Sequence, residues 1–475
     1  MFRILLCFVF LSGVVTGKEF RVSSERAPII PREFRAAWVA SVYNIDWPSR
    51  AGLPVKTQQT EMIAILDRLA SMKMNAIIFQ VRPNADALYQ SRIEPWSSWV
   101  SGKQGRAPGY DPLAFCIQQA HARGIEVHAW FNPFRALPNA SMAAASNHVT
   151  RTHPSVIRNY KTYKWMDPSV PFTQQRALSV IIDVVNRYDV DGVHIDDYFY
   201  PYPNVDAQGR ATPVFPDGKT PAQRRAASDR FVQAMYRQVK AKKPWVRVGI
   251  SPFGIWRPGV PEGTTASIDA YEHLAADSRK WLAQGWCDYL SPQLYWRIES
   301  PQSFTRLLTW WRAQGSRPVW PGIAASRIGS SEDPGRPASE IVNQVSLSRQ
   351  VGRNYVGHVF WSMKSLMQNR GGVNTQLVRN FYQQAALVPP MPWISRKAPA
   401  TPAVKARRSG KNTVVSWSKV PGCSKYAIQV RVGRIWRLSS VTAGTKLTLR
   451  GEPDAIAVSA VDRYGNSSNP RVVAK

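Results

Sequence analysis

Two adjacent aspartates, Asp196 and Asp197, are the residues of this chain whose type and spacing best fit catalytic chemistry. One carboxylate can attack or stabilise an oxocarbenium-like sugar centre, while a second carboxyl group protonates the leaving oxygen. Two close carboxyl groups also push their pKa values apart, so that one stays anionic and the other keeps its proton. The pair therefore indicates hydrolysis of a glycosidic bond. The structural alternative is that one aspartate caps a turn and the other pairs with an arginine.

The elements that would position this pair are eight apolar runs of strand length, separated by helical stretches and loops. The runs are residues 34–41, 76–83, 126–133, 191–198, 246–253, 287–295, 318–324 and 356–363. Helical periodicity is clearest in residues 58–72, 112–123, 176–187 and 221–240. Buried parallel strands alternating with helices predict a (β/α)8 TIM-like barrel. An open doubly wound sheet is the rival, and it is disfavoured because no glycine-rich phosphate loop follows the first strand.

Polar and aromatic residues gather at the carboxyl ends of these runs, where β/α barrels carry their active sites. Side chains two positions apart share a face of a strand, and here the shared face is often polar. A purely structural barrel interior would avoid such groups. Each histidine also fits a role in the core, and each aromatic residue a packing role. We predict that substrate is bound by Gln80, Arg82, His128, Trp130, Asn132, His194, Tyr198, Gln293, Tyr295, Trp296 and Trp361.

The proton donor is less well defined by the sequence, because the fifth run and its continuation, residues 246–257, contain no carboxylate. Three alternatives stay open. Asp197 donates the proton, or a carboxyl group from a loop does, or the N-acetyl group of the substrate serves as the nucleophile and two neighbouring carboxylates suffice. The loop candidates are Asp86, Glu94, Glu262, Asp269 and Glu272.

No metal or other cofactor is expected. The seven histidines form no HxH or HExxH pattern, and the cysteines form no CxxC pattern. Cys116, Cys287 and Cys423 are far apart and odd in number, so they do not indicate a disulfide framework. Cys116 and Cys287 lie in apolar surroundings and are expected to be buried.

The beginning of the chain and its charge both point to the cell envelope. Residues 1–17 have the positive start, apolar stretch and small residues of a signal peptide. No later run approaches the roughly 20 apolar residues of a membrane span, and no lipid-attachment cysteine is evident. The net charge is +31, but the basic residues are dispersed and no nucleic-acid-binding motif appears. We therefore expect a soluble exported protein, periplasmic or envelope-associated, whose partner is an anionic envelope polysaccharide.

The composition of the sequence changes after Phe381. Residues 388–402 are rich in proline, and residues 403–475 contain short β-type segments at 413–417, 425–430, 446–449 and 455–461. These segments resemble a fibronectin type III-like sandwich. The predicted organisation is a signal peptide (1–17), a barrel domain (30–387), a linker (388–402) and this small all-β domain (403–475).

Several motifs occur in the order seen in a known family. They are Phe34-Arg-Ala-Ala-Trp38, Asn75-Ala-Ile-Ile-Phe-Gln80-Val-Arg82-Pro, Ala129-Trp-Phe-Asn132-Pro-Phe-Arg135, Asp191-Gly-Val-His-Ile-Asp196-Asp197 and Ser291-Pro-Gln293-Leu-Tyr-Trp296. Over about residues 30–385 the chain resembles the bacterial glycosyl-hydrolase-like barrel family once called domain of unknown function 187. The resemblance implies a β/α barrel that hydrolyses peptidoglycan glycans stripped of their stem peptides.

The stretch from Gly192 to Asp196 is also similar to the strand-four motif of α-amylase-type barrels, whose last aspartate is the nucleophile. Those barrels carry arginine where this chain has His194, and the retaining, inverting and substrate-assisted mechanisms all stay open. Two other functions are compatible with the same residues. One is a non-catalytic protein that binds cell-wall glycan, and the other is a hydrolase of a different amino-sugar exopolysaccharide.

Overall fold

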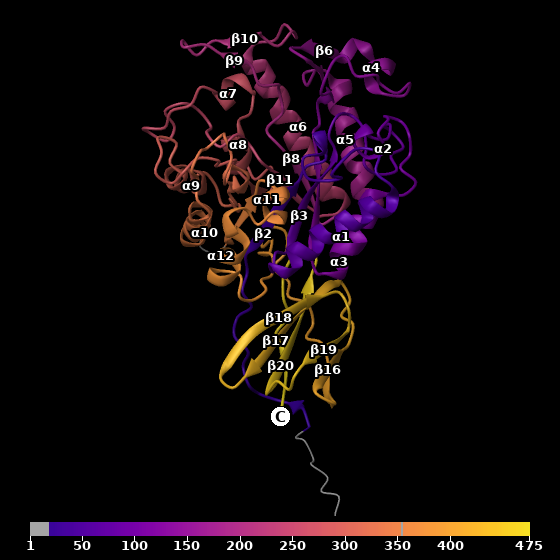
Figure 1. Ribbon diagram of the computed structural model, residues 1–475, viewed down its shortest axis with the longest axis vertical. Helices are drawn as coiled ribbons and strands as arrows, with labels where there is room; N and C mark the ends of the chain where they lie inside the picture. Colours follow the sequence, from indigo (N-terminus) through magenta and orange to yellow (C-terminus); the bar gives the residue numbers. More distant parts are fainter. Residues whose placement is uncertain (1–18, 353–354) are drawn as a thin grey trace, which may run out of the picture.

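The computed structural model describes residues 19–352 and 355–475, which form a β/α unit above a smaller all-β unit (Figure 1). The predicted signal peptide, residues 1–17, lies outside the described residues. Across the part of the chain that is described, no helix has both the length and the apolar character needed to cross a membrane.

The larger unit is a TIM-like barrel, and all eight predicted strands are confirmed. Their order around the sheet is β12-β11-β8-β4-β3-β2-β14-β13, with every pairing parallel. Hydrogen bonds from Leu290 N to Pro318 O and from Gly322 N to Pro292 O join the two ends of the sheet and close the barrel. The strands are β2 (Phe34–Val39), β3 (Ala76–Arg82), β4 (Glu126–Phe131), β8 (Gly192–Ile195), β11 (Arg247–Ile250), β12 (Tyr289–Leu290), β13 (Gly322–Ile323) and β14 (Gly357–Phe360).

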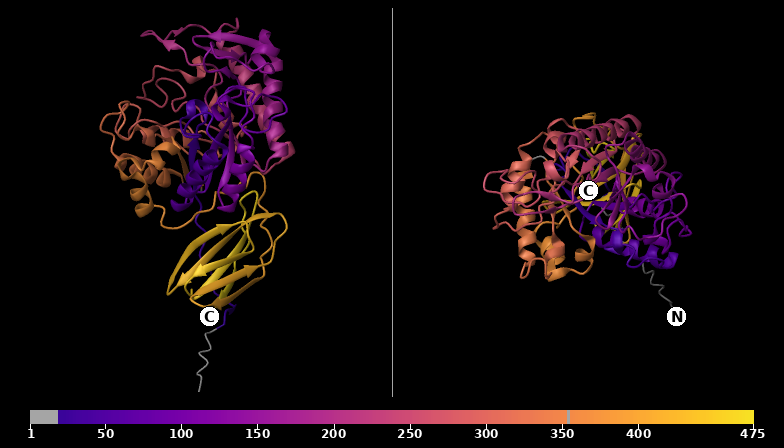
Figure 2. Two further views of the ribbon diagram at one scale, coloured as in Figure 1. Left: turned by 45° about the vertical axis from the view of Figure 1, so that its right-hand side comes forward. Right: turned by 90° about the horizontal axis from the view of Figure 1, so that it is seen from above.

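Helices form an outer layer around the barrel when it is viewed from above (Figure 2). The four predicted helices are confirmed as α1 (Val55–Ser71), α3 (Pro112–Ala122), α5 (Pro171–Arg187) and α6 (Pro221–Lys242). Local sequence defines their starts, because Asp111 caps α3 and Thr220 forms a capping box with Gln223 at α6. The remaining helices of four or more residues are α2 (Ser98–Ser101), α4 (Val149–Thr152), α7 (Ala270–His273), α8 (Ser278–Ala283), α9 (Phe304–Arg312), α10 (Ala338–Gly352), α11 (Met363–Met367) and α12 (Val373–Asn380). The apolar faces of these helices pack on the outward strand residues, and Cys116 and Cys287 are fully buried there as expected.

The barrel interior holds large rings opposite glycines. A Cβ built on Gly249 of β11 would lie 2.0 Å from the Tyr289 ring, and one on Gly192 of β8 would lie 2.6 Å from the His128 ring. On β14, a Cβ at Gly357 would lie 2.5 Å from Trp320. The glycines therefore provide the space in which these buried rings pack, with Tyr289 in tilted contact with both His128 and Trp320.

Replacing Gly249 by alanine is expected to destabilise the protein by about 1–3 kcal/mol, because the methyl group must displace the buried Tyr289 ring. Urea unfolding of both proteins measures this change. Gly444→Ala is a suitable control, since its nearest contact would be an ordinary 3.5 Å from Thr442. Equal stability of the Gly249→Ala and Gly444→Ala proteins would contradict the expectation.

Two small antiparallel sheets lie on the side of the barrel where the strands end. One contains β5 (Arg135–Leu137), β6 (Ile157–Tyr160) and β7 (Tyr163–Met166), in the connection between β4 and β8. The other contains β9 (Asn204–Val205) and β10 (Ala211–Thr212), between β8 and β11. They lie at the top of Figure 1, beyond the carboxyl end of β8. The aspartate pair therefore lies between two long insertions.

The smaller unit has two sheets that share one apolar core. The five-stranded sheet has the order β1-β21-β20-β17-β18, and the three-stranded sheet the order β15-β16-β19. The predicted segments appear as β16 (Asn412–Trp417), β17 (Cys423–Val432), β19 (Lys446–Arg450) and β20 (Ala455–Asp462). Four further strands were not predicted, because their exposed faces carry many polar residues: β1 (Arg21–Val22), β15 (Val404–Ser409), β18 (Ile435–Thr442) and β21 (Arg471–Ala474).

The two units meet at the amino ends of the barrel strands. Lys425 pairs with Glu126 at 3.1 Å, and Arg463 pairs with Asp189 at 2.6 Å. Arg247 donates from Nη2 to the carbonyl of Pro389 at 2.7 Å, so part of the proline-rich segment is bound to the barrel. The all-β unit consequently lies at the end of the barrel opposite the strand ends that carry the aspartates.

Candidate active site

A cavity of about 340 Å³ lies at the carboxyl ends of the barrel strands. It brings together residues from β2, β3, β4, β8 and the loops that follow them. Eight of the residues predicted from sequence line it, namely Gln80, Trp130, Asp196, Asp197, Tyr198, Gln293, Tyr295 and Trp361. The cavity therefore lies where the strand ends predicted it, and five of the predicted residues lie outside its lining.

The cavity wall also contains residues that the sequence analysis did not select. Trp38 lies on β2 and faces the barrel interior. It is two residues from both Ala36 and Ala40, so strand alternation could have placed it on the inward face. Ser251 lies one residue beyond the end of β11, in a segment where the sequence was searched for carboxylates alone. The others lie in the connections that follow the barrel strands, which alternation along those strands cannot orient: Val42, Tyr43, Ile45, Arg135 and Tyr202.

Asp196 is held by a chain of oriented amides. The backbone N–H groups of Ser41 and Val42 donate to Gln80 Oε1, at 3.0 and 2.9 Å. Gln80 Nε2 then donates to Asn132 Oδ1 at 2.7 Å, and Asn132 Nδ2 donates to Asp196 Oδ2 at 2.6 Å. Because each amide has its acceptor end occupied, its donor end points toward the next residue. Gln80 and Asn132 thus orient Asp196, and Asn132 lies behind it, outside the cavity lining.

Asp197 enters the same cavity because β8 ends at Ile195 and alternation no longer separates neighbouring side chains. Its carboxylate is 2 % exposed and accepts a hydrogen bond from the Tyr202 hydroxyl. Burial, followed by the charge of Asp196, raises the pKa of Asp197 to about 7, although the Tyr202 hydrogen bond acts in the opposite direction.

Asp196 has a different balance of interactions. Burial raises the pKa of its carboxyl group, while the charge of Arg135 and the hydrogen bond from Asn132 oppose this rise. The Arg135 guanidinium is itself fixed over the Tyr198 ring, 4.3 Å from the centroid. Asp196 therefore has the support that an anion needs, whereas Asp197 is disposed to hold a proton near neutral pH.

Arg82 does not line the cavity. The register of β3 and β4 shifts between Gln80 and Arg82, so that Arg82 lies opposite Phe131 instead of the next inward residue. The guanidinium turns away from the barrel mouth and pairs with the fully buried Glu94 at 2.6 Å. A local bulge therefore breaks the strand alternation that would have put Arg82 on the same face as Gln80.

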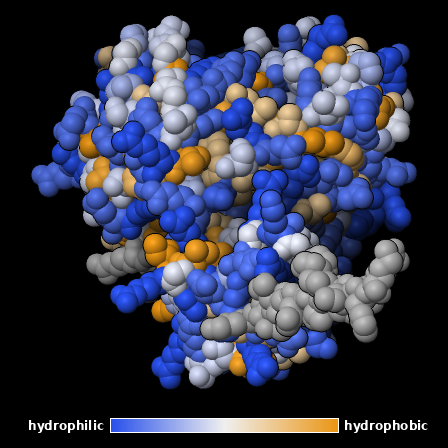
Figure 3. Space-filling view, turned by 60° about the horizontal axis from the view of Figure 1, so that its bottom comes forward, coloured by the Kyte–Doolittle hydropathy of each residue, from blue (hydrophilic) through white to orange (hydrophobic). Residues whose placement is uncertain are grey.

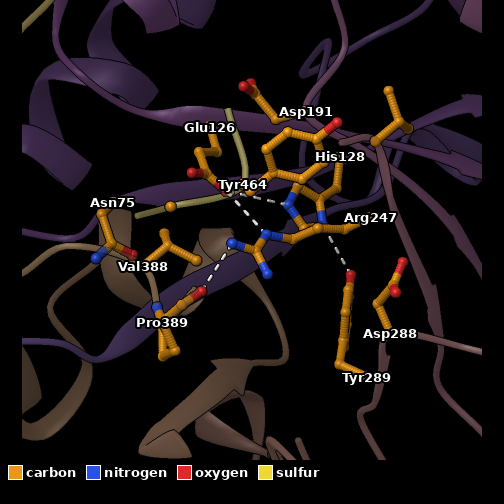
Figure 4. A network of polar contacts seen from close by, with 12 residues as sticks. Asn75, Glu126, His128, Asp191, Arg247, Asp288, Tyr289, Val388, Pro389 and Tyr464 are labelled. Carbon is orange, nitrogen blue, oxygen red and sulfur yellow. Dashed lines mark hydrogen bonds and ion pairs between the residues drawn. The ribbon is translucent and has the colours of Figure 1, made fainter. Parts of the chain in front are cut away.

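His128 and His194 lie deeper in the barrel, and neither contacts Asp196. The Tyr289 hydroxyl lies between them, 2.8 Å from His128 Nδ1 and 3.0 Å from His194 Nδ1. Trp38 Nε1 donates to His194 Nε2 at 3.2 Å, and burial holds the pKa of His194 well below its usual value. Figure 4 shows His128 near Tyr289 and Glu126, toward the junction with the all-β unit. These histidines occupy positions in the core, and Trp296 likewise packs on Phe253 outside the cavity lining.

The loop carboxylates proposed as acid/base candidates also lie outside the cavity lining. Asp86 is buried against Gln104, Glu94 pairs with Arg82, and Asp269 caps α7. Glu262 and Glu272 do not line the cavity either. Within residues 19–352 and 355–475, the carboxylates that line it are Asp196 and Asp197 alone. In the same residues, no group of three or more histidine, cysteine, aspartate or glutamate side chains is arranged to hold a metal ion.

Comparison with known proteins identifies the family. Residues 33–333 match the family model described as Glycosyl hydrolase-like 10. The chain is 39% identical over 404 residues to Glycosyl hydrolase YngK of Bacillus subtilis (strain 168), a match that covers 80% of this chain and 78% of that protein. The chain belongs to the glycosyl hydrolase-like 10 family. It is a glycoside hydrolase, and the resemblance to a glycosyl-hydrolase-like barrel family is confirmed.

The chain is also similar to a second curated relative and to solved structures. Glycosyl hydrolase DigH of Escherichia coli (strain K12) is 35% identical over 325 residues, which cover 62% of this chain and 74% of that protein. Among solved structures, the PgaB (BpsB) glycoside hydrolase domain from Bordetella bronchiseptica has a TM-score of 0.46 at 13% identity, and the match covers 74% of this chain and 98% of that chain. The assignment rests on the family match and on the relatives of higher identity.

Proposed function

We propose that this glycoside hydrolase cleaves peptidoglycan glycan strands that lack stem peptides, with Asp196 and Asp197 as its catalytic residues. The observation that carries this proposal is the aspartate pair itself. Both carboxylates are buried in one aromatic cavity, and the pKa of one is raised to about 7 beside the other. The aromatic rings of Trp130, Trp361 and Tyr295 supply flat apolar surfaces for sugar rings.

In the proposed mechanism Asp197 is the acid. Its protonated carboxyl group donates to the glycosidic oxygen as the bond to the anomeric carbon breaks. Asp196 stays anionic, because Asn132 and Arg135 support its charge, and it stabilises the positive charge that develops on the sugar.

The positions of the two aspartates favour assistance by the substrate. Consecutive Cα atoms are about 3.8 Å apart, so both side chains approach the sugar from the end of one strand. A nucleophile and an acid on opposite sides of the bond would require two separate elements. We therefore propose that the acetamido oxygen of an N-acetyl sugar attacks the anomeric carbon while Asp196 orients the acetamido group. Water then opens the resulting ring, which leaves a new reducing end.

A panel of polymers tests the substrate assignment. Wild-type protein is incubated with intact peptidoglycan, with amidase-stripped glycan, with stripped glycan that has been de-N-acetylated, and with a poly-amino-sugar exopolysaccharide. The proposal predicts reducing ends from amidase-stripped glycan and none after de-N-acetylation. Cleavage of the exopolysaccharide alone would assign the site to that polymer. Binding of stripped glycan without release of reducing ends would favour the non-catalytic alternative.

The cellular setting and the domain organisation are part of the same proposal. Residues 1–17 serve as an export signal, so that the protein acts in the periplasm or at the envelope. Residues 30–387 form the catalytic domain, 388–402 the linker and 403–475 a fibronectin type III-like domain. The high positive charge favours retention near an anionic polymer.

Replacing Tyr202 by phenylalanine is expected to move the alkaline limb of the pH–kcat/KM profile to higher pH. The Tyr202 hydroxyl donates to Asp197 and stabilises its anionic form, so its removal raises a pKa that already lies at about 7. Activity depends on protonated Asp197 and should persist to higher pH in the variant. Tyr200→Phe is the matched control, because the Tyr200 hydroxyl has no hydrogen-bond partner among the described residues. An alkaline limb that stays in place in Tyr202→Phe would show that Asp197 does not control it.

A further inference from the structure

The exposed face of the three-stranded sheet in the all-β unit carries a row of cations that the proposed hydrolysis does not use. Residues 403–475 contain 14 lysines and arginines against three aspartates and glutamates. The surface seen from this end of the molecule is largely hydrophilic, with scattered hydrophobic patches (Figure 3). This part of the chain therefore carries a strong excess of positive charge.

Strand register places four of these cations on one face. Ser416 of β16 lies between Lys405 of β15 and Lys446 of β19. Alternation puts Arg407 on the same face as Lys405, and Arg450 on the same face as Lys446. The opposite face is apolar, because Val404, Val415, Trp417 and Leu449 form the shared core. We call the four exposed residues the basic face: Lys405, Arg407, Lys446 and Arg450.

The three acidic residues of this unit are engaged elsewhere. Glu452 pairs with Arg408 and Lys475, and Asp462 accepts hydrogen bonds from its own turn. Asp454 accepts a hydrogen bond from Gly433. In the described part of the chain, no member of the basic face makes an ion pair within 4 Å, so its charge is free to meet a ligand.

The geometry points to a linear polymer with repeated anionic groups. Neighbouring strands are about 4.8 Å apart, so Lys405 and Lys446 lie about 10 Å from one another across the sheet. Positions 405 and 407 are separated by about 7 Å along one strand. We propose that the basic face binds a linear anionic polymer of the cell envelope through its carboxylate or phosphate groups, and so retains the enzyme on that polymer.

The residues between the cations favour this occupant over nucleic acid or membrane. Ser416, Val414, Asn412 and Thr448 fill the face between the basic residues, and none of them offers an aromatic ring on which a base could stack. The face also lacks the large apolar residues with which interfacial segments enter a lipid layer. The face belongs to the unit at the opposite end of the barrel from the cavity, so it can hold one strand while the cavity cleaves another.

Retention on insoluble polymer measures this role without any hydrolysis. The full chain carrying Asp196→Asn is tested against amidase-stripped glycan and against poly(glycerol phosphate), at low ionic strength and at about 0.15 M salt. The face variant and a control with the same change in net charge are compared with it. The face variant is Lys405→Gln, Arg407→Gln, Lys446→Gln and Arg450→Gln, and the control is Lys56→Gln, Lys103→Gln, Arg237→Gln and Lys242→Gln, which are exposed cations of the barrel.

The face variant is expected to bind at least about tenfold more weakly, and the control less than about twofold, because four adjacent charges act on the same polymer segment. Tighter retention on stripped glycan would identify carboxylate as the anionic group that is bound, and tighter retention on poly(glycerol phosphate) would identify phosphate. This proposal rests on the proposed function only for the location of the protein at the cell envelope. It does not depend on hydrolysis, because retention is measured without cleavage. Equal losses in both variants would overturn it, as would unchanged retention of a face variant whose near-ultraviolet circular dichroism is native. The proposal would also be overturned if the protein with an unchanged basic face bound duplex DNA or anionic-lipid vesicles more tightly than both polymers.

Discussion

Asp197→Asn protein is expected to cleave amidase-stripped glycan with a kcat roughly 10²–10⁴-fold below that of the wild type, because the leaving oxygen loses its proton donor. The loss should be much smaller for an N-acetyl sugar that carries an acidic aryl leaving group, since such a group departs without protonation. The alkaline limb near pH 7 should also disappear, because it reports the pKa of Asp197. Steady-state rates on both substrates across pH measure these effects.

Loss of activity in this variant is not expected to reflect unfolding. The folded-state pKa of Asp197, about 7, lies above the value of about 3.9 for a free aspartate. Ionising it therefore costs folding free energy, and its contribution to stability falls as the pH rises from about 4 to 7. Asparagine removes this cost, so thermal stability at pH 8 should be maintained. Equal rate losses for the glycan and the aryl substrate would contradict the assignment of Asp197 as the acid.

Asp196→Asn protein is expected to lose at least about 100-fold in kcat on both substrates, because a neutral amide cannot stabilise the positive sugar centre. The aryl leaving group does not rescue this variant, which distinguishes it from Asp197→Asn. Removing the charge of Asp196 also removes one cause of the raised pKa of Asp197, so that pKa should fall below 7. Carbon-13 NMR titration of the Asp197 carboxyl group measures the shift.

The matched control for Asp196→Asn is Asp86→Asn. Asp86 is also buried, and burial raises its pKa to about 7, but it hydrogen-bonds Gln104 outside the cavity lining. Asp86→Asn should therefore keep its kcat, whatever it loses in stability. A comparable loss of kcat in both variants would mean that the effect of Asp196→Asn reflects general disruption of the barrel.

The barrel could be predicted from the sequence because its strands are buried on both sides and its helices have clear apolar faces. The runs that became β3, β4 and β8 are nearly continuous in apolar residues. The strands of the all-β unit were harder to predict where one face meets water. In β15, for example, Lys405, Arg407 and Arg408 are exposed, and the pattern resembles a polar loop.

The candidate site could be predicted where alternation holds and not where it breaks. Trp130 and Gln80 lie on regular strands and Asp196 directly follows one, and the sequence placed all three on the inward face. Arg82 departs because of a bulge that the sequence does not signal. Arg135 and Tyr202 come from insertions whose path depends on tertiary packing, so no local pattern indicated that they reach Asp196 and Asp197.

The central claim is that the aspartate pair acts on a glycan bound in this cavity. A crystal structure of the Asp197→Asn protein with a fragment of amidase-stripped glycan tests it most directly. The account predicts sugar rings against Trp130 and Trp361, an acetamido group beside Asp196, and the glycosidic oxygen within hydrogen-bond distance of residue 197. A fragment bound elsewhere on the barrel, with the cavity free of sugar at saturating concentration, would contradict it.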